Sequence, residues 1–305
     1  LNASGVRRGG LAQNVITFVK VSLIVAVIVM PLVLAGPQFE RLVSASVQST
    51  GSRAALQNVG TAMILCLFSF SGAYFVTHVA EEVREPEKTI PRAIVVGFLV
   101  VLALYLSINV AYLVTLPFDE VVQSERIAAD MMGSVLGERG ALVTAFVIFC
   151  SAIGALNTQL LSYPRIPFAL ARDGYLFRGI AQVSRRSRAP ANAIVLVGGL
   201  ASIFALTGSY SEILSFVAFV SHFFICLAVL AVIMLRIREP DLPRPYRVWG
   251  YPLTPVAFLV VSAVYLVNLL FTRPLGVAVG VAMVLAGLPF YLYWRRGPIG
   301  RGQGL

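Results

Sequence analysis

Long apolar stretches follow one another along almost the whole chain, and short polar connections separate them. A helix that spans a bilayer needs about 20 mostly apolar residues, so each stretch is long enough to cross a membrane. Strands of a transmembrane barrel would alternate apolar and polar positions, whereas these stretches are continuous runs of Leu, Val, Ala and Ile. The pattern predicts eight transmembrane helices, over residues 14–35, 57–80, 93–116, 140–163, 191–208, 213–235, 252–271 and 275–294.

The composition favours an all-α, polytopic helical membrane protein. Of the 305 residues, 58% are hydrophobic and 12% are charged, and the mean hydropathy is +0.85. Because no soluble domain separates the spans, we expect residues 1–305 to form a single transmembrane domain. The connection at 117–139 combines acidic and apolar residues, which predicts a short surface helix. The chain begins with Leu1 rather than Met, and we expect further residues before it.

The basic residues are distributed unevenly between the two ends of the predicted helices. With eight spans, 19 of the 24 Lys and Arg residues fall on the side that holds both termini, and five fall on the other side. The positive-inside rule makes the richer side cytoplasmic. We therefore expect both termini in the cytoplasm, and the net charge of +10 implies no nucleic-acid partner.

The sequence contains no recognisable enzyme motif. It has no nucleophile elbow, no His-Glu-x-x-His and no phosphate-binding glycine loop. Cys66, Cys150 and Cys226 lie in apolar runs without the spacing of metal ligands. We expect no enzyme activity, no cofactor and no metal, so any transport would be gradient-driven or passive.

Lys20 is the clearest polar exception inside a predicted span. It lies about 9 Å along the first span at 1.5 Å per residue, where a lysine facing lipid is costly. Its ammonium either reaches back to the cytoplasmic interface or points into the helix bundle. In the fourth span, Gly154, Asn157 and Thr158 share a helix face. The side chains of Asn157 and Thr158 would either form hydrogen bonds between helices or accept hydrogen bonds from the Lys20 ammonium.

The second span has small and polar residues near its middle, in the stretch 67–75. An interrupted helix there would leave backbone carbonyls and N–H groups free to line a cavity, as in secondary transporters. Close helix packing through small residues is the alternative, and the spacing does not separate the two. His78, later in the same span, and His222 are the only histidines. A single imidazole in a helix bundle more often packs through a hydrogen bond than relays protons, so we expect packing roles.

Four segments, in order, resemble amino acid permeases of the amino acid-polyamine-organocation superfamily. The run from Phe68 to Phe75, followed by Ala-Glu-Glu-Val-Arg-Glu-Pro-Glu-Lys-Thr-Ile-Pro-Arg-Ala, is similar to that family's sixth helix and the loop after it. Residues 14–20 resemble its fifth helix, 162–174 the end of its eighth, and 235–247 the loop after its tenth.

The resemblance implies that the eight spans are helices five to twelve of a twelve-helix transporter whose fold contains two inverted five-helix repeats. Helices one to four would then be missing partners. It further implies secondary-active, alternating-access transport of an amino acid across the cytoplasmic membrane, within a lipid bilayer. Sodium-independent transport, coupled to protons or working by exchange, is implied by Lys20, which matches a lysine that replaces a sodium ion and reaches toward Asn157 and Thr158. The substrate-binding residues implied are Phe68, Ser69, Phe70, Ser71, Gly72, Ala73 and Tyr74.

One alternative remains for the chain as a whole. It could be a truncated membrane subunit or gene remnant of the same fold that does not transport by itself.

Overall fold

The fold comes from a computed structural model that describes residues 6–44, 66, 69–184, 189–207 and 210–295. Helices joined by turns and short connections make up these residues, and no strand occurs among them. The apolar runs become helices because a backbone in hydrocarbon must form its hydrogen bonds within its own segment. The helices are α1 (Val6–Leu34), α2 (Glu40–Ser44), η2 (Ser71–Glu82), α4 (Pro86–Thr115), α5 (Phe118–Gln123), α6 (Ile127–Leu136), α7 (Glu138–Ser162), α8 (Arg165–Arg172), η3 (Arg178–Ala181), α9 (Ala191–Thr207), α10 (Tyr210–Arg238), α11 (Leu253–Thr272) and α12 (Pro274–Arg295).

Six helical segments of the described chain are long and apolar enough to cross a membrane. They include α1, α4, α7, α10, α11 and α12, so the prediction of an all-helical integral membrane protein is confirmed. Of the two remaining predicted spans, 57–80 lies largely outside the described residues. The other, 191–208, corresponds to α9, which has 17 residues and is shorter than the six. The count of eight spans stays a prediction.

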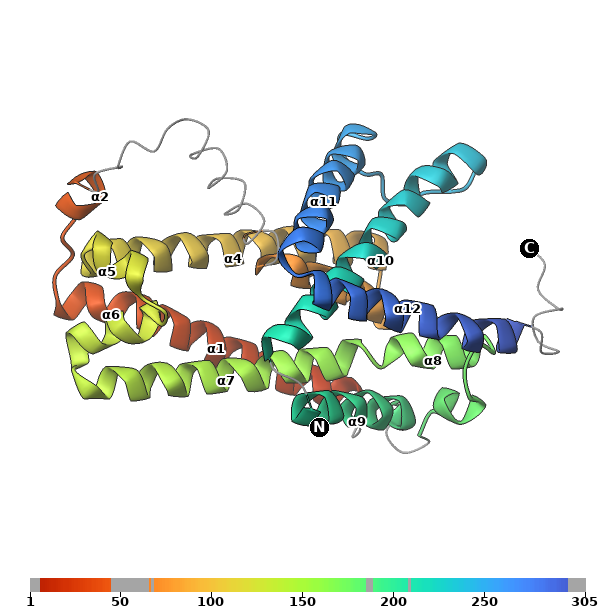
Figure 1. Cartoon of the computed structure of the whole chain (residues 1–305), viewed down its shortest axis with the longest axis horizontal. Coiled ribbons are helices and arrows are strands. Elements are labelled where there is room, and N and C mark those ends of the chain that lie inside the picture. Colours follow the sequence, from red (N-terminus) through yellow and green to blue (C-terminus); the bar gives the residue numbers. More distant parts are fainter. Residues whose placement is uncertain (1–5, 45–65, 67–68, 185–188, 208–209, 296–305) are drawn as a thin grey trace. The chain divides into compact units, whose positions relative to one another are not determined.

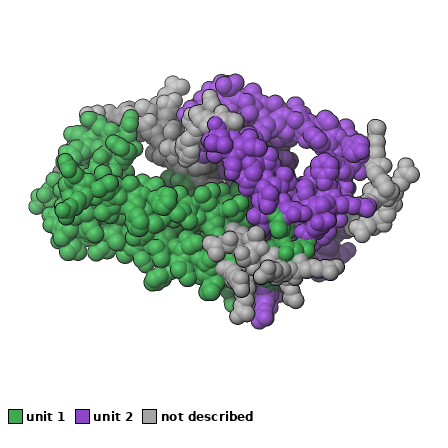
Figure 2. Space-filling model, turned by 90° about the horizontal axis from the view of Figure 1, so that it is seen from below, with its two compact units in different colours: residues 1–83, 89–163, 183–191 green, residues 84–88, 164–182, 192–305 purple. Residues whose placement is uncertain are grey.

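The described helices belong to two compact units, coloured separately in Figure 2. The first comprises residues 1–83, 89–163 and 183–191, and the second comprises 84–88, 164–182 and 192–305. The single transmembrane domain expected from the sequence stays a prediction.

In the first unit, α1 packs along α7, and α6 packs against both (Figure 1). The two long helices run antiparallel, because Gln13 of α1 bonds Asn157 of α7 while the later Ile16 lies beside the earlier Gly154. A cluster of buried apolar side chains forms the core of this unit. Its members are Val27, Ile28, Ala111, Leu116, Met131, Met132 and Val147.

The connection predicted to hold one short surface helix instead contains two helices, α5 and α6. Met131 and Met132 of α6 are fully buried, so α6 is a core element and not a surface helix. Gly137, with a φ of +59°, lets the chain turn directly from α6 into α7. A Cβ on Gly140 would overlap the Met132 carbonyl, so this glycine allows α7 to lie against the end of α6.

The second unit is organised around α10, which packs against both α11 and α12. Gly280 of α12 faces α10, where a Cβ at this position would lie 3.0 Å from Cγ2 of Val220. On another side of α10, the His222 ring packs against Tyr265 of α11 with centroids 4.6 Å apart. The contact at Gly280 is close because small residues let membrane helices approach one another.

Large apolar side chains are exposed along the long helices. Phe18 of α1 is 74% exposed, Leu142 of α7 72% and Val195 of α9 72%. In water, extensive apolar surface of this kind promotes aggregation or partner binding. In a bilayer, lipid tails are as apolar as leucine, so these exposed helix faces can lie against lipid.

Candidate functional site

The backbone changes its helix type at Phe70, within the stretch where the sequence allows an interrupted helix. Cys66 and Ser69 have α-helical geometry, and the Phe70 N–H still donates to the Cys66 carbonyl at 3.2 Å. Phe70 itself has φ −97° and ψ 4°, outside the helix that follows. From Ser71 the chain continues as the 3-10 helix η2 for 12 residues. Runs of 3-10 helix beyond three or four residues are uncommon and often mark strained or hinge segments, so the 12 residues of η2 that follow this joint are an unusual backbone feature.

Helix α4 supports the joint from one side. The Phe70 ring packs against Phe98 and Tyr105, with centroid distances of 4.9 Å and 5.3 Å. The Tyr105 hydroxyl donates to the Ser69 carbonyl at 3.4 Å. A carbonyl just before the joint is therefore accessible to a donor from outside its own helix.

The predicted substrate residues are arranged around this joint. Ser69 and Phe70 lie before η2, the η2 backbone begins at Ser71, and the exposed Gly72 and Ala73 follow in its first turn. Space is open beside Gly72, since a Cβ there would meet no atom within 4 Å. Tyr74 is half-buried with its ring 4.7 Å from that of Phe75, and Phe68 lies outside the described residues.

Farther along η2, His78 and α7 are joined by a short chain of hydrogen bonds. Nδ1 of His78 is 3.1 Å from Oγ of Ser162, and this hydroxyl donates to the Phe75 carbonyl at 2.9 Å. Ser162 is buried, with 3% of its surface exposed. The ring of Tyr163 covers the same place, 5.1 Å from Phe75 and 6.1 Å from His78. No pattern in the sequence linked Ser162 to a histidine 84 residues away.

The predicted coupling residues lie on the facing sides of α1 and α7. Asn157 donates from Nδ2 to Oε1 of Gln13 at 2.7 Å. One turn earlier on α7, the Lys20 side chain passes Gly154, with Cδ 3.9 Å from where a Cβ on that glycine would lie. Thr158 donates to the Gly154 carbonyl at 3.0 Å, within its own helix.

The structure thus brings Lys20 and Asn157 to one helix interface, while the Thr158 hydroxyl bonds α7 itself. Gln13 was missed in the sequence, although its position seven residues before Lys20 puts both on one face of α1. Helix α7 connects this interface to the His78 cluster, because Gly154 and Ser162 are separated by about 12 Å of helix at 1.5 Å per residue.

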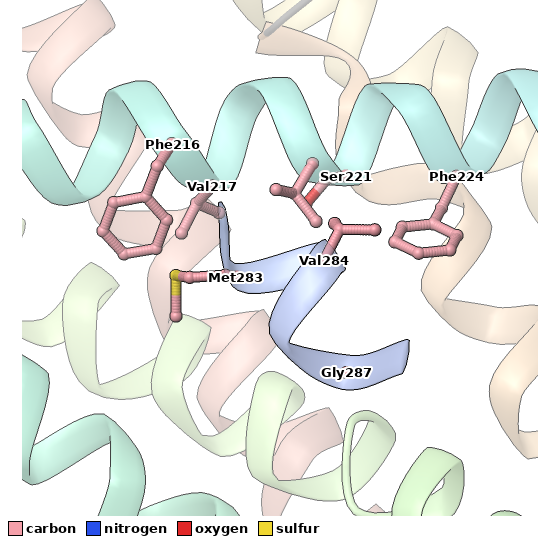
Figure 3. A pocket seen from close by; sticks show the side chains of 8 residues that line it. Phe216, Val217, Ser221, Phe224, Met283, Val284 and Gly287 are labelled. Atoms are coloured by element: carbon pink, nitrogen blue, oxygen red, sulfur yellow. The ribbon is translucent and has the colours of Figure 1, made fainter. Parts of the chain in front are cut away.

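The second unit has a groove between α10 and α12, shown in Figure 3. Its volume is about 410 Å³, and none of the predicted site residues lines it. The lining is apolar apart from Ser221, so the groove lacks the charged partners that an amino acid's ammonium and carboxylate require. The lining residues are Phe216, Val217, Val220, Ser221, Phe224, Met283, Val284 and Gly287.

Comparison with known proteins identifies several relatives. A human cystine/glutamate transporter is 28% identical over 307 residues, and the match covers 98% of this chain and 59% of the relative. A rat b(0,+)-type amino acid transporter 1 is 28% identical, with 95% of this chain and 59% of the relative covered. A human Asc-type amino acid transporter 1 is 31% identical over 76% of this chain and 44% of the relative. The chain therefore spans less than two thirds of the length of these relatives.

These relatives are transporters and not enzymes, in agreement with the expectation from the sequence. Their partial coverage also agrees with the resemblance to a C-terminal portion of a longer transporter. The family profile described as amino acid permease matches residues 1–293, almost the whole chain. The chain belongs to the amino acid permease family.

Proposed function

We propose that this chain forms part of a secondary-active amino acid transporter that works by alternating access across the cytoplasmic membrane. The observation that carries the proposal is the change of helix type at Phe70, in a chain of the amino acid permease family. Helix interruptions at membrane depth are tolerated where the backbone lines a cavity or is buried in protein, and in secondary transporters they form substrate sites. Both termini face the cytoplasm in this proposal, in keeping with the distribution of basic residues.

Backbone groups at this joint would bind the substrate. The carbonyl end of a helix carries partial negative charge, and the Ser69 carbonyl already accepts a hydrogen bond from the Tyr105 hydroxyl. A substrate ammonium is a stronger donor for such a carbonyl, because charge-assisted hydrogen bonds are stronger than neutral ones. The open space at Gly72 would admit the substrate backbone. Ala73 and Tyr74 would then border the substrate side chain.

The Lys20 ammonium would occupy the position where a sodium-coupled transporter holds its cation. The Lys20 stem lies against α7 at Gly154, one turn from Asn157, which supports this role. Thr158 lies on the same turn as Asn157 and completes the proposed coupling set. A fixed ammonium makes a bound sodium ion unnecessary, so transport would be sodium-independent, either proton-coupled or by exchange.

Uptake in proteoliposomes tests this function. The longest open reading frame that contains the sequence is expressed, and uptake of a labelled amino acid mixture is measured with and without sodium and a proton gradient. We expect uptake that does not respond to sodium, and sodium-dependent uptake would contradict the coupling role of Lys20. Absence of uptake from correctly inserted protein would favour the non-transporting subunit.

The chain offers a matched control for the coupling residue, because Lys20 and Lys88 are its two lysines. Lys88 is 63% exposed and pairs with Glu85 at 2.9 Å, outside the proposed site. We expect Lys20→Ala to abolish uptake or change its pH dependence, and Lys88→Ala to leave both unchanged. Equal behaviour of the two variants would remove Lys20 from the mechanism.

A further inference from the structure

The hydrogen bonds around Ser162 define which nitrogen of His78 carries a proton. A serine hydroxyl has one hydrogen, and Ser162 donates it to the Phe75 carbonyl, which can only accept. Towards Nδ1 of His78, 3.1 Å away, the same oxygen is therefore the acceptor. Nδ1 carries a hydrogen in this arrangement, and Nε2 of the neutral ring has a free lone pair.

Proton uptake at Nε2 is compatible with this arrangement. It leaves the Nδ1–H to Ser162 bond in place and strengthens it, since a charged donor forms a shorter and stronger hydrogen bond. Three aromatic rings lie around the imidazole in edge-on or tilted arrangements. They belong to Tyr74, Phe75 and Tyr163, at centroid distances of 5.9 Å, 6.1 Å and 6.1 Å.

Few titratable groups compete for this proton. From α7, the helix packed against η2, the titratable residue that faces His78 is Tyr163. On η2 itself they are Tyr74, in ring contact, and the carboxylates of Glu81 and Glu82 near the helix end. In a 3-10 helix, residues three apart lie on one face, so Glu81 follows His78 by one turn. Within the described part of the chain, His78 forms no ion pair, and imidazole is the side chain whose unperturbed pKa lies between pH 5 and 8.

We propose that His78 is a proton-binding residue of this protein, with Ser162 as the positioning residue that holds its ring. The proton binds to the lone pair of Nε2, and the positive charge stays on the imidazole. Because Ser162 also bonds the Phe75 carbonyl, protonation tightens the contact between η2 and α7, five residues beyond the joint at Phe70. The proton site thus lies on η2, the same helix as part of the proposed substrate site. It is separate from Lys20.

Nitrogen NMR of the imidazole tests proton binding without any transport assay. The histidines of these 305 residues are His78 and His222, so the imidazole signal that His78→Asn removes and His222→Asn retains belongs to His78. In protein reconstituted in nanodiscs with ¹⁵N-labelled histidine, we expect a neutral ring protonated at Nδ1 and a reversible transition to the imidazolium between about pH 5 and 8. Ser162→Ala should release the ring and raise the share of the tautomer protonated at Nε2. A ring protonated at Nε2 in the parent protein, or one that does not titrate, would overturn the proposal.

Transport measurements test the link to the proposed function, on which this part of the inference rests. His78→Asn keeps an N–H donor near the position of Nδ1 but cannot take up a proton. Between pH 5.5 and 7.5 its uptake should vary less than about twofold, while the parent and His222→Asn respond in parallel and more strongly. An unchanged pH response in His78→Asn would contradict the link. Failure of the parent to transport would reject the proposed function, while the NMR result would still decide whether His78 binds a proton.

Discussion

Asn157 of α7 donates a hydrogen bond to Gln13 of α1, from Nδ2 to Oε1 over 2.7 Å. The Asn157 side chain is 8% exposed, so the bond lies inside the interface of two membrane-spanning helices. Other polar side chains lie nearby on both helices, among them Thr17 of α1, to which Gln13 also donates a hydrogen bond, and Thr158 of α7. A bond of this kind constrains both the register and the rotation of the two helices, because it forms only when the two amides face each other.

Removal of this amide pair should destabilise the interface measurably. We expect Asn157→Ala and Gln13→Ala each to lower the thermal unfolding temperature in detergent. In a double-mutant cycle, their effects should be coupled by about 0.6 kcal/mol, the average for such bonds in membrane proteins. Gln159→Ala, which removes an exposed amide from the same helix, is the control and should have little effect. Additive effects of the two substitutions would show that the bond contributes no stability.

Gly154 sets the distance between α1 and α7 beside Lys20. A Cβ at this position would lie 2.8 Å from Cγ2 of Ile16, which is too close without movement of the side chain. We expect Gly154→Ala to destabilise the protein by about 1–3 kcal/mol, as overpacking does. Ile16→Ala removes the obstructing methyl group and should restore part of the loss. Gly97→Ala, with no atom within 4 Å of the new Cβ, should be neutral or stabilising.

The membrane helices could be predicted from the sequence because their signal is local. About 20 apolar residues suffice to define a span whatever its neighbours are. Helix α11 matches the expected segment to within one residue at both ends, and α1 and α4 end within one residue of theirs but begin eight and seven residues earlier. The joint at Phe70 also has a local signal, in the small and polar residues around it. The structure settles the geometry of that joint, and its role in substrate binding stays a proposal.

Pairwise relations between distant segments could not be predicted in the same way. The bonds from Asn157 to Gln13 and from His78 to Ser162 join residues 144 and 84 positions apart. Their detection requires knowledge of which helices are neighbours and of how each is rotated. The burial of α6 was missed for a related reason, since a short helix with mixed polar and apolar residues has the same pattern at a surface and against a core.

Gly140 should be less replaceable than Gly154, because its neighbour is backbone. A Cβ there would overlap the Met132 carbonyl, so the turn between α6 and α7 would have to open. We expect Gly140→Ala to cost at least about 3 kcal/mol, the upper end of common overpacking effects, and to reduce the yield of folded protein. Gly133→Ala, in α6 with open space around it, is the matched control. A folded and equally stable Gly140→Ala protein would show that this turn adapts without cost.

Arg244 closes the C-terminal end of α10 with its guanidinium group. The last carbonyls of a helix lack partners further along the helix. The fork of two Nη atoms reaches one of them, that of Leu235, and at the same time carbonyls of the connection that follows Arg238. Its acceptors are the carbonyls of Leu235, Glu239, Pro240 and Leu242. A lysine carries its donors on a single nitrogen and cannot reach the same set of carbonyls.

The Arg244→Lys variant should therefore loosen the helix end although it keeps the charge. Loss of about 1 kcal/mol of local stability corresponds to about fivefold faster amide exchange in this segment, because exchange reports local opening. Hydrogen exchange of peptides that cover residues 235–247 measures the effect. Arg247→Lys, an exposed arginine in the same connection, is the control and should leave the exchange rates unchanged. Equal exchange in the Arg244→Lys variant and the parent would show that the guanidinium fork is dispensable, and that other contacts hold the connection in place.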